Sequence, residues 1–456
     1  MAPRRNAAGP APTIDRTVAG LAARGVAHEA VADLLGKNRA FALDDALTQA
    51  GRDAGLDPAD TALARAIATV TFRRLGYLRR VLAARMSQGL PEDQPRLVAL
   101  LATGAAQILD LNVPDHAAVD LSVRLAKADP YLQHLGGVVN AVLRRIVRER
   151  AEILAAATDP LADNTPDWLR DRWSATYGVE TAQRIAAAHL RGAALDVTVR
   201  GSPAEWAERL GGVALPWGSI RLPELRANVA DLPGYAEGAW WVQDAAAAIP
   251  ARLLGAGAGE RVADLCAAPG GKTAQLAATG ATVLAVDRSA ARLERLAQNL
   301  ARLGLEAEIH VGDALALDDA AGFDAVLLDA PCSATGTIRR HPDVAWTKNA
   351  GDRVRLEALQ RRLLDKAARL VKPGGRLVYC TCSLEPEEGE AQVTGFLARN
   401  ADYERAPIAA DEVGGLTELI DAQGDLRTLP AHLDGPTPDR QGGLDGFYAA
   451  RLRRRG

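Results

Sequence analysis

The stretch that decides the fold is residues 264–273, which read DLCAAPGGKT. An apolar run, Arg261–Cys266, leads into it and a helical pattern begins at Lys272, so we predict a turn from a strand into a helix. The small residues and two adjacent glycines allow the backbone to approach a ligand closely. A Walker A loop needs a glycine where this chain has Cys266, and the glycines at 255, 257 and 259 precede the strand rather than follow it. The turn therefore matches neither a triphosphate loop nor a dinucleotide fingerprint.

Strand and helix patterns alternate from this turn toward the C-terminus. The further predicted strands are Thr282–Val286, Glu308–Val311, Ala325–Leu328 and Arg376–Tyr379, and the predicted helices are Lys272–Ala278, Ala290–Leu303 and Leu356–Leu370. This repetition predicts an α/β domain over residues 241–456, a parallel sheet with helices on both faces. The terminal run from Asp445 to Tyr448, with several arginines after it, is interpreted as a last strand with a basic tail.

Three acids follow successive predicted strands. Asp287 ends the second strand, Asp313 the third and Asp329 the fourth. A carboxylate at Asp287 can accept both ribose hydroxyls of a nucleoside, and one at Asp313 can accept from an adenine amino group. One such acid is more often a helix N-cap, but three on neighbouring strand ends favour one shared ligand. With the glycine-containing turn, the pattern resembles the Rossmann-like methyltransferase fold that uses S-adenosyl-L-methionine.

Two cysteine motifs lie at the ends of the fourth and fifth strands. The first reads LDAPCS at residues 328–333 and the second reads YCTCSL at residues 379–384. Together with the turn, they resemble the RNA cytosine-5 methyltransferase family. From residue 14 onward the chain resembles the bacterial Fmu/Sun branch of that family, which modifies small-subunit ribosomal RNA.

The resemblance implies a role for each site residue. Cys382 is the expected nucleophile that adds to cytosine C6, and Cys332 is expected to assist release of the adduct. Asp329 is expected to bond the N3 or N4 edge of the base, and Lys272 to hold a thiol in its anionic form. The expected cofactor-binding residues are Cys266, Ala267, Ala268, Pro269, Gly270, Gly271, Lys272, Asp287, Arg292, Asp313 and Asp329.

The other thiols need a separate interpretation. Cys380 stands where the family has a small residue, and we interpret it as facing away from the catalytic thiol. Side chains alternate along a strand, so Cys380 and Cys382 should face the same side unless the chain turns after Tyr379. The sequence leaves this open. Cys266 is interpreted as a small hydrophobic residue beneath the turn.

Some polar residues are weaker candidates. Gln243 and Asp244 match a family position near the methionine end of the cofactor, and a helix cap is the alternative. Arg292 follows Asp287 on a helix and either reaches the cofactor or is solvated. The run Arg339-Arg340-His341 is expected to contact RNA phosphates, and no second His or Cys stands at metal-ligand spacing from His341.

Residues 14–155 show apolar residues at helical spacing and predict an all-α bundle. The predicted helices are Val18–Leu35, Leu63–Met86, Leu97–Leu109, Val119–Ala126 and Val138–Val147. The stretch Gln107–Leu111, with Pro114, Ala117, Val119, Leu125–Lys127, Gly137–Asn140 and Leu143-Arg144, resembles the NusB-like RNA-binding domain. Residues 156–240, with a predicted strand at Leu195–Arg200, are interpreted as a small α+β linker domain. Residues 1–13 are predicted to be disordered.

The charge is unevenly distributed. The whole chain carries −3, but residues 1–155 hold 20 Lys and Arg against 16 Asp and Glu. The arginines form two groups, the first Arg73, Arg74, Arg79, Arg80 and Arg85, the second Arg144, Arg145, Arg148 and Arg150. Such groups pair with phosphates or form solvated helix faces, and charge alone does not decide between the two.

Composition and motifs exclude several classes of protein. With 48% hydrophobic and 24% charged residues the chain is globular, no apolar run reaches the ~20 residues of a membrane span, and the N-terminus lacks a secretory h-region. Four cysteines indicate reduced thiols, so we expect a cytoplasmic, monomeric enzyme with an RNA partner and no metal. A DNA cytosine-5 methyltransferase would show a Glu-Asn-Val signature, which this chain lacks. An exocyclic-amine methylase would show the motif Asn/Asp-Pro-Pro-aromatic where this chain has Asp329-Ala330-Pro331-Cys332. A non-enzymatic RNA-binding factor would not keep both thiols and the turn.

Overall fold

The computed structural model describes residues 15, 17–36, 42–156, 159–223 and 228–456. The predicted disordered segment 1–13 lies outside these residues. The chain divides into two compact units, one of residues 1–174 with 341–347 and the other of residues 175–340 with 348–456. The first division therefore falls after Ser174 rather than after residue 155, and a short later segment counts with the first unit. Among the described residues, no helix is long and apolar enough to cross a membrane.

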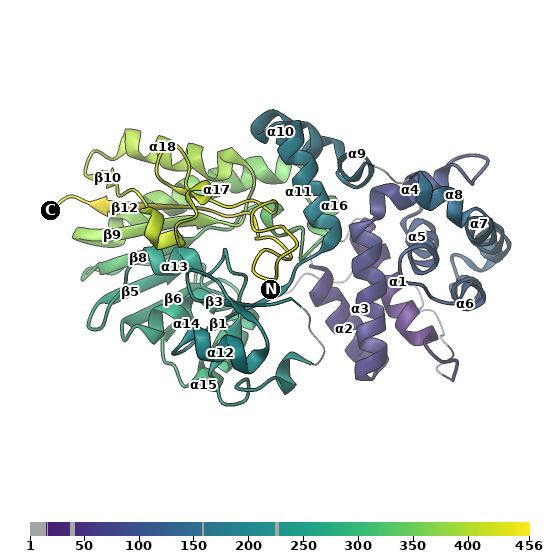
Figure 1. Cartoon of the computed structure of the whole chain (residues 1–456), viewed down its shortest axis with the longest axis horizontal. Coiled ribbons are helices and arrows are strands. Elements are labelled where there is room, and N and C mark those ends of the chain that lie inside the picture. The colour runs from purple at the N-terminus through teal and green to yellow at the C-terminus, as the bar shows by residue number, and fades with distance from the viewer. Residues whose placement is uncertain (1–14, 16, 37–41, 157–158, 224–227) are drawn as a thin grey trace. The chain divides into compact units, whose positions relative to one another are not determined.

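The first unit is helical (Figure 1). Its helices are α1 (Leu21–Leu35), α2 (Leu43–Ala54), α3 (Pro58–Arg73), α4 (Leu75–Ala83), α5 (Pro95–Leu109), α6 (Asp115–Ala128), α7 (Gly136–Arg148), α8 (Arg150–Ala155), α9 (Pro160–Asn164), most of α10 (Asp167–Tyr177) and the short α16 (Val344–Thr347). The single run predicted over Leu63–Met86 is broken at Arg74. Just beyond the break, a Cβ on Gly76 would lie 2.4 Å from the Asp163 carbonyl oxygen, so glycine allows α4 to approach that backbone.

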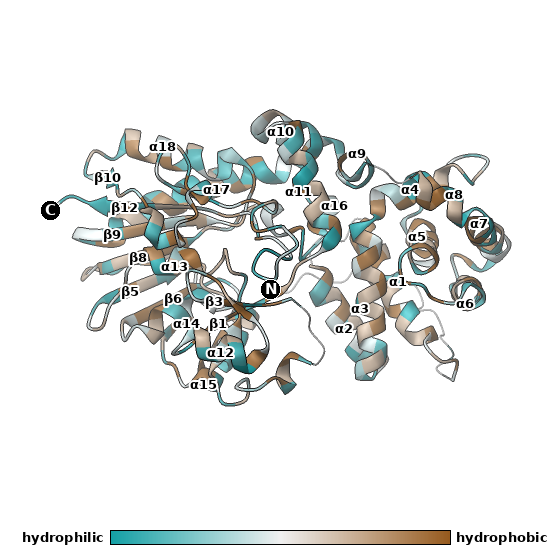
Figure 2. Ribbon diagram, in the orientation of Figure 1, coloured by the Kyte–Doolittle hydropathy of each residue, from teal (hydrophilic) through white to brown (hydrophobic). Residues whose placement is uncertain are grey.

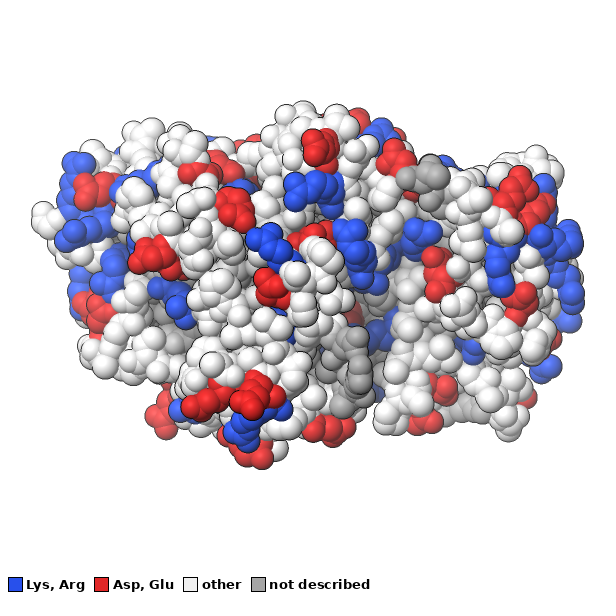
Figure 3. Space-filling view, in the orientation of Figure 1, with Lys and Arg blue, Asp and Glu red and all other residues white. Residues whose placement is uncertain are grey.

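Helix α7 is strongly amphipathic (Figure 2). Val139, Val142, Leu143 and Ile146 are buried at helical spacing. Its arginines lie on the exposed side, and Figure 3 shows Lys and Arg gathered over this end of the unit. Of the second arginine group, Arg144, Arg145 and Arg148 therefore face solvent, whereas Arg150 is half-buried and pairs with Asp115.

The arginines of the first group form ion pairs within the helical unit. Its ion pairs are Arg74–Asp110, Arg79–Glu92, Arg80–Asp163 and Arg85–Glu149. Burial lowers the pKa of Arg73. Four of the five arginines thus pair with acids that lie in turns or at helix ends, so this group is neither a free phosphate site nor a purely solvated face.

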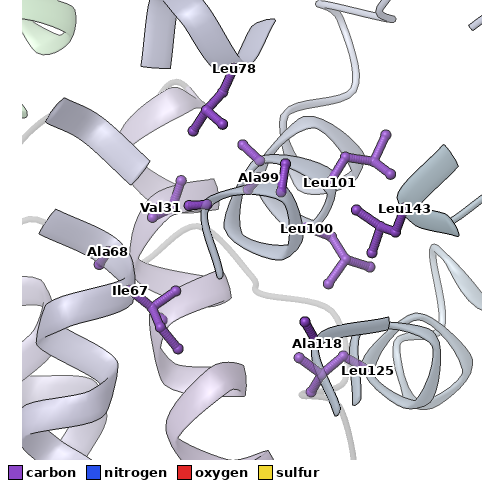
Figure 4. Packing of buried hydrophobic residues seen from close by; sticks show 14 of the residues in the cluster. Val31, Ile67, Ala68, Leu78, Ala99, Leu100, Leu101, Ala118, Leu125 and Leu143 are labelled. Atoms are coloured by element: carbon purple, nitrogen blue, oxygen red, sulfur yellow. The ribbon is translucent and has the colours of Figure 1, made fainter. Parts of the chain in front are cut away.

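Helix α5 forms the centre of this unit (Figure 4). Every residue from Leu97 to Leu109 is buried. Leu100 and Leu101 of α5 lie between Val31 of α1 on one side and Leu143 of α7 on the other. A helix that is apolar on all sides is stable only when other helices surround it.

The second unit contains two sheets. The smaller sheet has the order β2-β3-β1-β4, with β1 (Leu195–Val199), β2 (Val213–Ala214), β3 (Ser219–Leu222) and β4 (Trp240–Val242), accompanied by α11 (Val179–Arg191) and α12 (Pro203–Leu210). All its strand pairs are antiparallel. Residues 175–240 thus combine helices with an antiparallel sheet, and they belong to the same compact unit as the larger sheet. That they form a separate linker domain stays a prediction.

The larger sheet has the order β10-β12-β9-β8-β5-β6-β7 with β11 beside β12. Its strands are β5 (Arg261–Leu265), β6 (Thr282–Asp287), β7 (Glu308–Val311), β8 (Phe323–Asp329), β9 (Val371–Thr381), β10 (Tyr403–Arg405), β11 (Leu426–Arg427) and β12 (Tyr448–Arg454). Its helices are α13 (Ile249–Leu253), α14 (Gly271–Ala278), α15 (Ala290–Leu303), α17 (Ala350–Leu370) and α18 (Glu390–Arg399).

The sheet is mixed rather than wholly parallel. The pairs joining β5 to β9 through β8, and β5 to β7 through β6, are parallel, as predicted. The last strand, β12, runs antiparallel between β9 and β10. Two parallel strands that follow each other in the chain need a long crossover, usually an α-helix, that returns the chain to the end of the sheet where the first strand began. The residues between β10 and β12, all of which the structure describes, form no α-helix, so the two strands run antiparallel.

Helices cover both faces of this sheet (Figure 1). Val262, Leu327 and Val378 belong to the apolar cluster that includes α13, and the residues after them in sequence belong to the cluster that includes α17 and α18. This alternation follows from the two-residue period of a strand. The Rossmann-like fold is thereby confirmed.

Candidate active site

The turn after β5 is held tightly between β5 and α14. Gly270 has φ 103°, and a Cβ there would lie 2.6 Å from Leu296 Cγ, so only glycine fits without displacing α15. The Ala267 amide donates to the Val286 carbonyl at 3.0 Å, and the Ala268 amide donates to Asp287 Oδ2 at 3.2 Å. The cradle expected over residues 266–272 is thus fixed to the neighbouring strand.

The three acids predicted at strand ends lie along one edge of the sheet. Asp287 is the last residue of β6, Asp329 the last of β8, and Asp313 stands two residues after β7. Because β8, β5, β6 and β7 are neighbours, their carboxyl ends meet at this edge. One pocket brings together four of the expected cofactor residues, Cys266, Asp287, Arg292 and Asp313.

These carboxylates also bind backbone amides. Asp313 Oδ1 accepts from Leu315 N at 3.0 Å, and Asp287 Oδ1 accepts from Ser289 N at 2.9 Å. The Arg292 guanidinium lies 3.6 Å from Asp287 and donates to the Ala268 carbonyl. Arg292 therefore braces the turn as well as lining the pocket.

Two buried groups lie at the base of the turn. Thr273 Oγ1 donates to Asp264 Oδ2 at 2.6 Å, and burial raises the pKa of Asp264 to about 7. Cys266 has φ 64° and partly buried side-chain atoms packed on the core, as expected of a small hydrophobic residue. Burial raises its pKa to about 12, so it remains a neutral thiol at neutral pH.

The two motif cysteines meet at the ends of β8 and β9. Cys332 Sγ lies 3.4 Å from Cys382 Sγ, although 50 residues separate them. The Ala330 amide donates to the Cys380 carbonyl at 2.9 Å, and the Gly336 amide donates to the Cys382 carbonyl at 3.0 Å. The hydrogen bond to Cys382, followed by burial, raises the pKa of Cys332 well above its ordinary value.

Lys272 and Asp329 form an ion pair beside these thiols. Lys272 Nζ donates to Asp329 Oδ2 at 2.8 Å. Burial alone would lower the pKa of Lys272, but Asp329, Cys380 and Cys382 raise it overall. Lys272 is therefore a permanent cation that interacts electrostatically with both Cys380 and Cys382. That it holds a thiol in its anionic form stays a prediction.

The interpretation of Cys380 is wrong. Strand β9 continues through Thr381, so the chain does not turn after Tyr379. Cys380 is fully buried and Cys382 partly buried, and both contact the same apolar cluster on one face of the sheet. Cys380 Sγ donates to Asp329 Oδ1 at 3.5 Å, while only Cys382 reaches Cys332. Depth along the strand, not the facing side, separates the two thiols.

The expectation that Arg339 and Arg340 contact phosphates is also wrong. Arg339 is fully buried and donates to Asp244 Oδ2 at 2.6 Å and to Asp445 Oδ1 at 3.0 Å. Arg340 pairs with Asp244 as well. Burial alone would raise the pKa of Asp244, but the guanidinium groups of Arg340 and Arg339 lower it well below its ordinary value. His341 belongs to the helical unit and lies 3.5 Å from Asp44.

The side chain of Gln243 is also buried and makes its hydrogen bonds within the protein. Its Oε1 accepts from Thr198 and Trp241, and its Nε2 donates to Gln275 at 2.8 Å. A Cβ on Gly271 would lie 3.4 Å from this amide, so Gln243 supports the start of α14 from beneath. Its position, like that of Asp244, is explained by internal hydrogen bonds.

Sequence reasoning missed one buried acid. The run after the second cysteine motif, Glu385–Glu388, was given no role, yet Glu388 contacts the residues that follow both cysteines. An acid close behind a cysteine motif is the only sequence signal for it, and a solvated turn would give the same signal.

Comparisons with known proteins identify the family of this chain. Residues 251–453 match the family model described as 16S rRNA methyltransferase RsmB/F, and residues 21–148 match the NusB family. The curated ribosomal RNA small subunit methyltransferase B of Shewanella oneidensis is 35% identical over 415 residues, covering 86% of this chain and 90% of that protein. Its counterpart in Xanthomonas campestris is 39% identical over 370 residues, covering 78% and 83%.

Solved structures share the fold. The crystal structure of PH0851 matches with a TM-score of 0.75 and 23% identity, covering 96% of this chain and 99% of that one. A methyltransferase homologue from Pyrococcus horikoshii matches with a TM-score of 0.51 and 29% identity, covering 62% and 94%. With 35% and 39% identity to relatives covered over 90% and 83% of their length, the chain belongs to the RsmB/F family of 16S rRNA methyltransferases and carries an N-terminal NusB-family domain.

Proposed function

We propose that this enzyme transfers a methyl group from S-adenosyl-L-methionine to C5 of a cytosine in small-subunit ribosomal RNA, through a covalent adduct between Cys382 and cytosine C6. The observation that carries the proposal is the 3.4 Å approach of the Cys332 and Cys382 sulfurs beside the Lys272–Asp329 ion pair. The names of the curated relatives support ribosomal RNA as the substrate.

Two thiols suit this chemistry because cytosine C5 is a poor nucleophile. A thiolate that adds to C6 turns the ring into an enamine whose C5 can attack a methyl donor. Cys332 holds its proton because its hydrogen bond to Cys382 raises its pKa. Cys382, whose sulfur lies 3.4 Å from that of Cys332 and interacts with the Lys272 cation, is the better placed nucleophile.

The same pair explains release of the product. Once Cys382 has bonded to C6, its sulfur carries no charge and the main cause of the raised pKa of Cys332 is gone. Cys332 can then lose its thiol proton to bulk solvent, and the resulting thiolate takes the extra proton from C5. The electron pair of that C–H bond restores the ring double bond and expels Cys382 as a thiolate.

Asp329 would orient the base. Its Oδ2 accepts from Lys272, and its side chain keeps 31% of its surface exposed. This carboxylate would accept a hydrogen bond from the N4 amino group of cytosine and so place C6 at the thiols.

The residues at the carboxyl edge fit S-adenosylmethionine. Gly270 leaves no side chain over the turn, Asp287 can accept from ribose hydroxyls, and Asp313 from the adenine amine. Residues 266–272 and Arg292 complete the proposed cofactor site. When bound, the cofactor supplies an electrophilic methyl group, and the turn and acids would fix its position next to the thiols.

The product itself tests the function. The purified enzyme, given methyl-labelled S-adenosylmethionine and small-subunit ribosomal RNA, should yield labelled 5-methylcytidine after digestion to nucleosides. Bisulfite mapping of ribosomal RNA should show one protected cytosine in cells that have the protein and no protection of that cytosine in cells that lack it. Label in any other nucleoside would overturn the proposal.

Asp287→Ala should weaken binding of S-adenosylmethionine by about 1–3 kcal/mol, because buried partner groups lose their acceptor. Isothermal calorimetry measures the change, and Asp318→Ala, which removes an exposed acid nearby, should leave affinity unchanged. Equal affinities for wild type and Asp287→Ala would remove Asp287 from the site.

Arg144 and Arg148 should supply RNA affinity. Both are exposed and line the groove between α6 and α7, whereas the first arginine group is held in ion pairs. Replacing both with Gln should reduce the slope of log K against log salt by about 1.4 to 1.8, the value for two lost phosphate contacts. Filter binding at several salt concentrations gives the slope.

Replacing Arg79 and Arg80 with Gln is the matched control. Their acids, Glu92 and Asp163, already neutralise them, so the slope should stay at its wild-type value. A reduced slope for this control with an unchanged slope for the Arg144 and Arg148 variant would move the RNA contact to α4.

A further inference from the structure

A single buried acid, Glu388, joins the two thiol motifs. It closes the short 3-10 turn η5 (Pro386–Glu388) and is fully buried. Its carboxylate accepts from the Ser333 amide at 2.9 Å and from the Ser333 hydroxyl, and Oε2 accepts from Ser383 Oγ at 2.6 Å. Ser333 directly follows Cys332, and Ser383 directly follows Cys382.

Further hydrogen bonds hold Glu388 in place. Gln360 Nε2 donates to its Oε1 at 3.0 Å and to the carbonyl of Pro331, the residue before Cys332, at 2.9 Å. The Glu388 carbonyl accepts from Tyr379 Oη at 2.7 Å. Tyr379 lies near the end of β9, so the backbone of Glu388 is tied to the strand that leads to Cys382.

We propose that Glu388 is a positioning residue that fixes the two motif loops so that the Cys332 and Cys382 sulfurs meet. Charge-assisted hydrogen bonds to a buried carboxylate are stronger and more directional than bonds between neutral groups. Without the carboxylate, the Ser333 amide and the Ser333 and Ser383 hydroxyls lose their common charged acceptor. The loops then keep links between neutral groups, among them the 3.1 Å contact of the two serine hydroxyls and the bond from the Gly336 amide to the Cys382 carbonyl. The proposal rests on the proposed function for its catalytic meaning, since thiol proximity is what Glu388 provides.

A purely structural role gives a different expectation. It would lower the free energy of unfolding but leave the distance between the two sulfurs unchanged in the molecules that remain folded. A measurement of thiol proximity in folded protein therefore separates the two roles.

Diamide supplies that measurement. Its N=N bond accepts two electrons and two protons from a pair of thiols, which join as a disulfide while diamide becomes the hydrazine. The rate depends on how readily the sulfurs move from 3.4 Å to about 2.05 Å. Alkylation and peptide mapping of the full-length protein identify the Cys332–Cys382 pair and exclude pairs with Cys266 or Cys380.

Glu388→Ala should slow formation of the Cys332–Cys382 disulfide by at least about tenfold, because small displacements of reacting atoms have large effects on rate. Glu388→Gln should fall between this variant and wild type, because its amide oxygen can still accept from Ser333 N. Glu387→Ala removes an acid from the same turn whose carboxylate lies 3.4 Å from Arg353, and it should react at the wild-type rate. A wild-type rate in folded Glu388→Ala would overturn the proposal.

Serine variants keep the test decisive if Glu388→Ala does not fold. Ser333→Ala and Ser383→Ala each remove one hydroxyl group that donates to the carboxylate. Each should slow formation of the disulfide, and the double variant should slow it more. Their effects should be smaller in a Glu388→Gln background, as expected for residues that share one network. Wild-type rates in both serine variants would show that the carboxylate does not set the thiol distance.

Steady-state kinetics connect the proposal to catalysis. Glu388→Gln should lower kcat for methyl transfer while the KM values for RNA and S-adenosylmethionine stay near wild type. The diamide reaction needs neither substrate. If the wild-type enzyme does not methylate cytosine but the disulfide rates follow the expected order, the proposed function fails and the positioning role stands.

Discussion

Cys382→Ala should abolish methyl transfer and form no covalent protein–RNA complex. Without a thiol at this position, nothing adds to cytosine C6 and C5 is not activated. We expect a loss of about 10⁴- to 10⁶-fold, the range seen when a catalytic group of a covalent mechanism is removed. Label transfer from methyl-labelled S-adenosylmethionine to small-subunit ribosomal RNA gives the rate, and a denaturing gel shows the complex.

Cys332→Ala should give the opposite gel result. The adduct still forms at Cys382 and the methyl group is still transferred, but no thiol takes the proton from C5. The methylated RNA therefore stays attached, and a protein–RNA band should accumulate in the presence of cofactor. Turnover should stop after a single methyl transfer.

The neighbouring thiol provides the control. Cys380 is buried below the site and donates to Asp329, so Cys380→Ala should still form the adduct and turn over, with activity within a few-fold of wild type. A band for Cys382→Ala with none for Cys332→Ala would exchange the two roles. Loss of the adduct in Cys380→Ala but not in Cys382→Ala would assign the nucleophile to Cys380.

Arg339→Ala should destabilise the catalytic unit by about 3–5 kcal/mol, because it removes one of the two guanidinium groups that neutralise the buried carboxylates of Asp244 and Asp445, and only Arg340 remains to pair with both. The side chain is fully buried, so the loss comes from uncompensated charge and not from RNA binding. Urea unfolding monitored by fluorescence should show a lower midpoint for the transition of this unit.

An exposed arginine in the same unit is the comparison. Arg399 pairs with Asp365 at the surface, with 43% of its side chain exposed, and Arg399→Ala should change the midpoint little. If Arg339→Ala kept the wild-type midpoint but lost RNA affinity, Arg339 would contact phosphates after all.

The sequence by itself determined the classes of element and the edge that carries the site. Helix Ala290–Leu303 and strand Glu308–Val311 have the predicted bounds. The helix could be predicted because its leucines recur at a period of 3.6 residues and are the residues that must be buried. The acids at the ends of β6 and β8 lie where the strand pattern placed them. The family motifs are also local, since each lies within ten residues of the chain.

Only the tertiary structure decided how charges and thiols are paired. Arg339 and Arg73 resemble solvated or phosphate-binding arginines in sequence, yet Arg339 is fully buried and Arg73 half-buried, and the partners of Arg339 lie 95 and 106 residues away. The choice between Cys380 and Cys382 depended on where β9 ends beside the Cys332 loop, 50 residues earlier. A local pattern records whether a side chain faces the core or solvent. It does not record which distant segment the fold brings against that side chain, and this contact sets both pKa and chemical role.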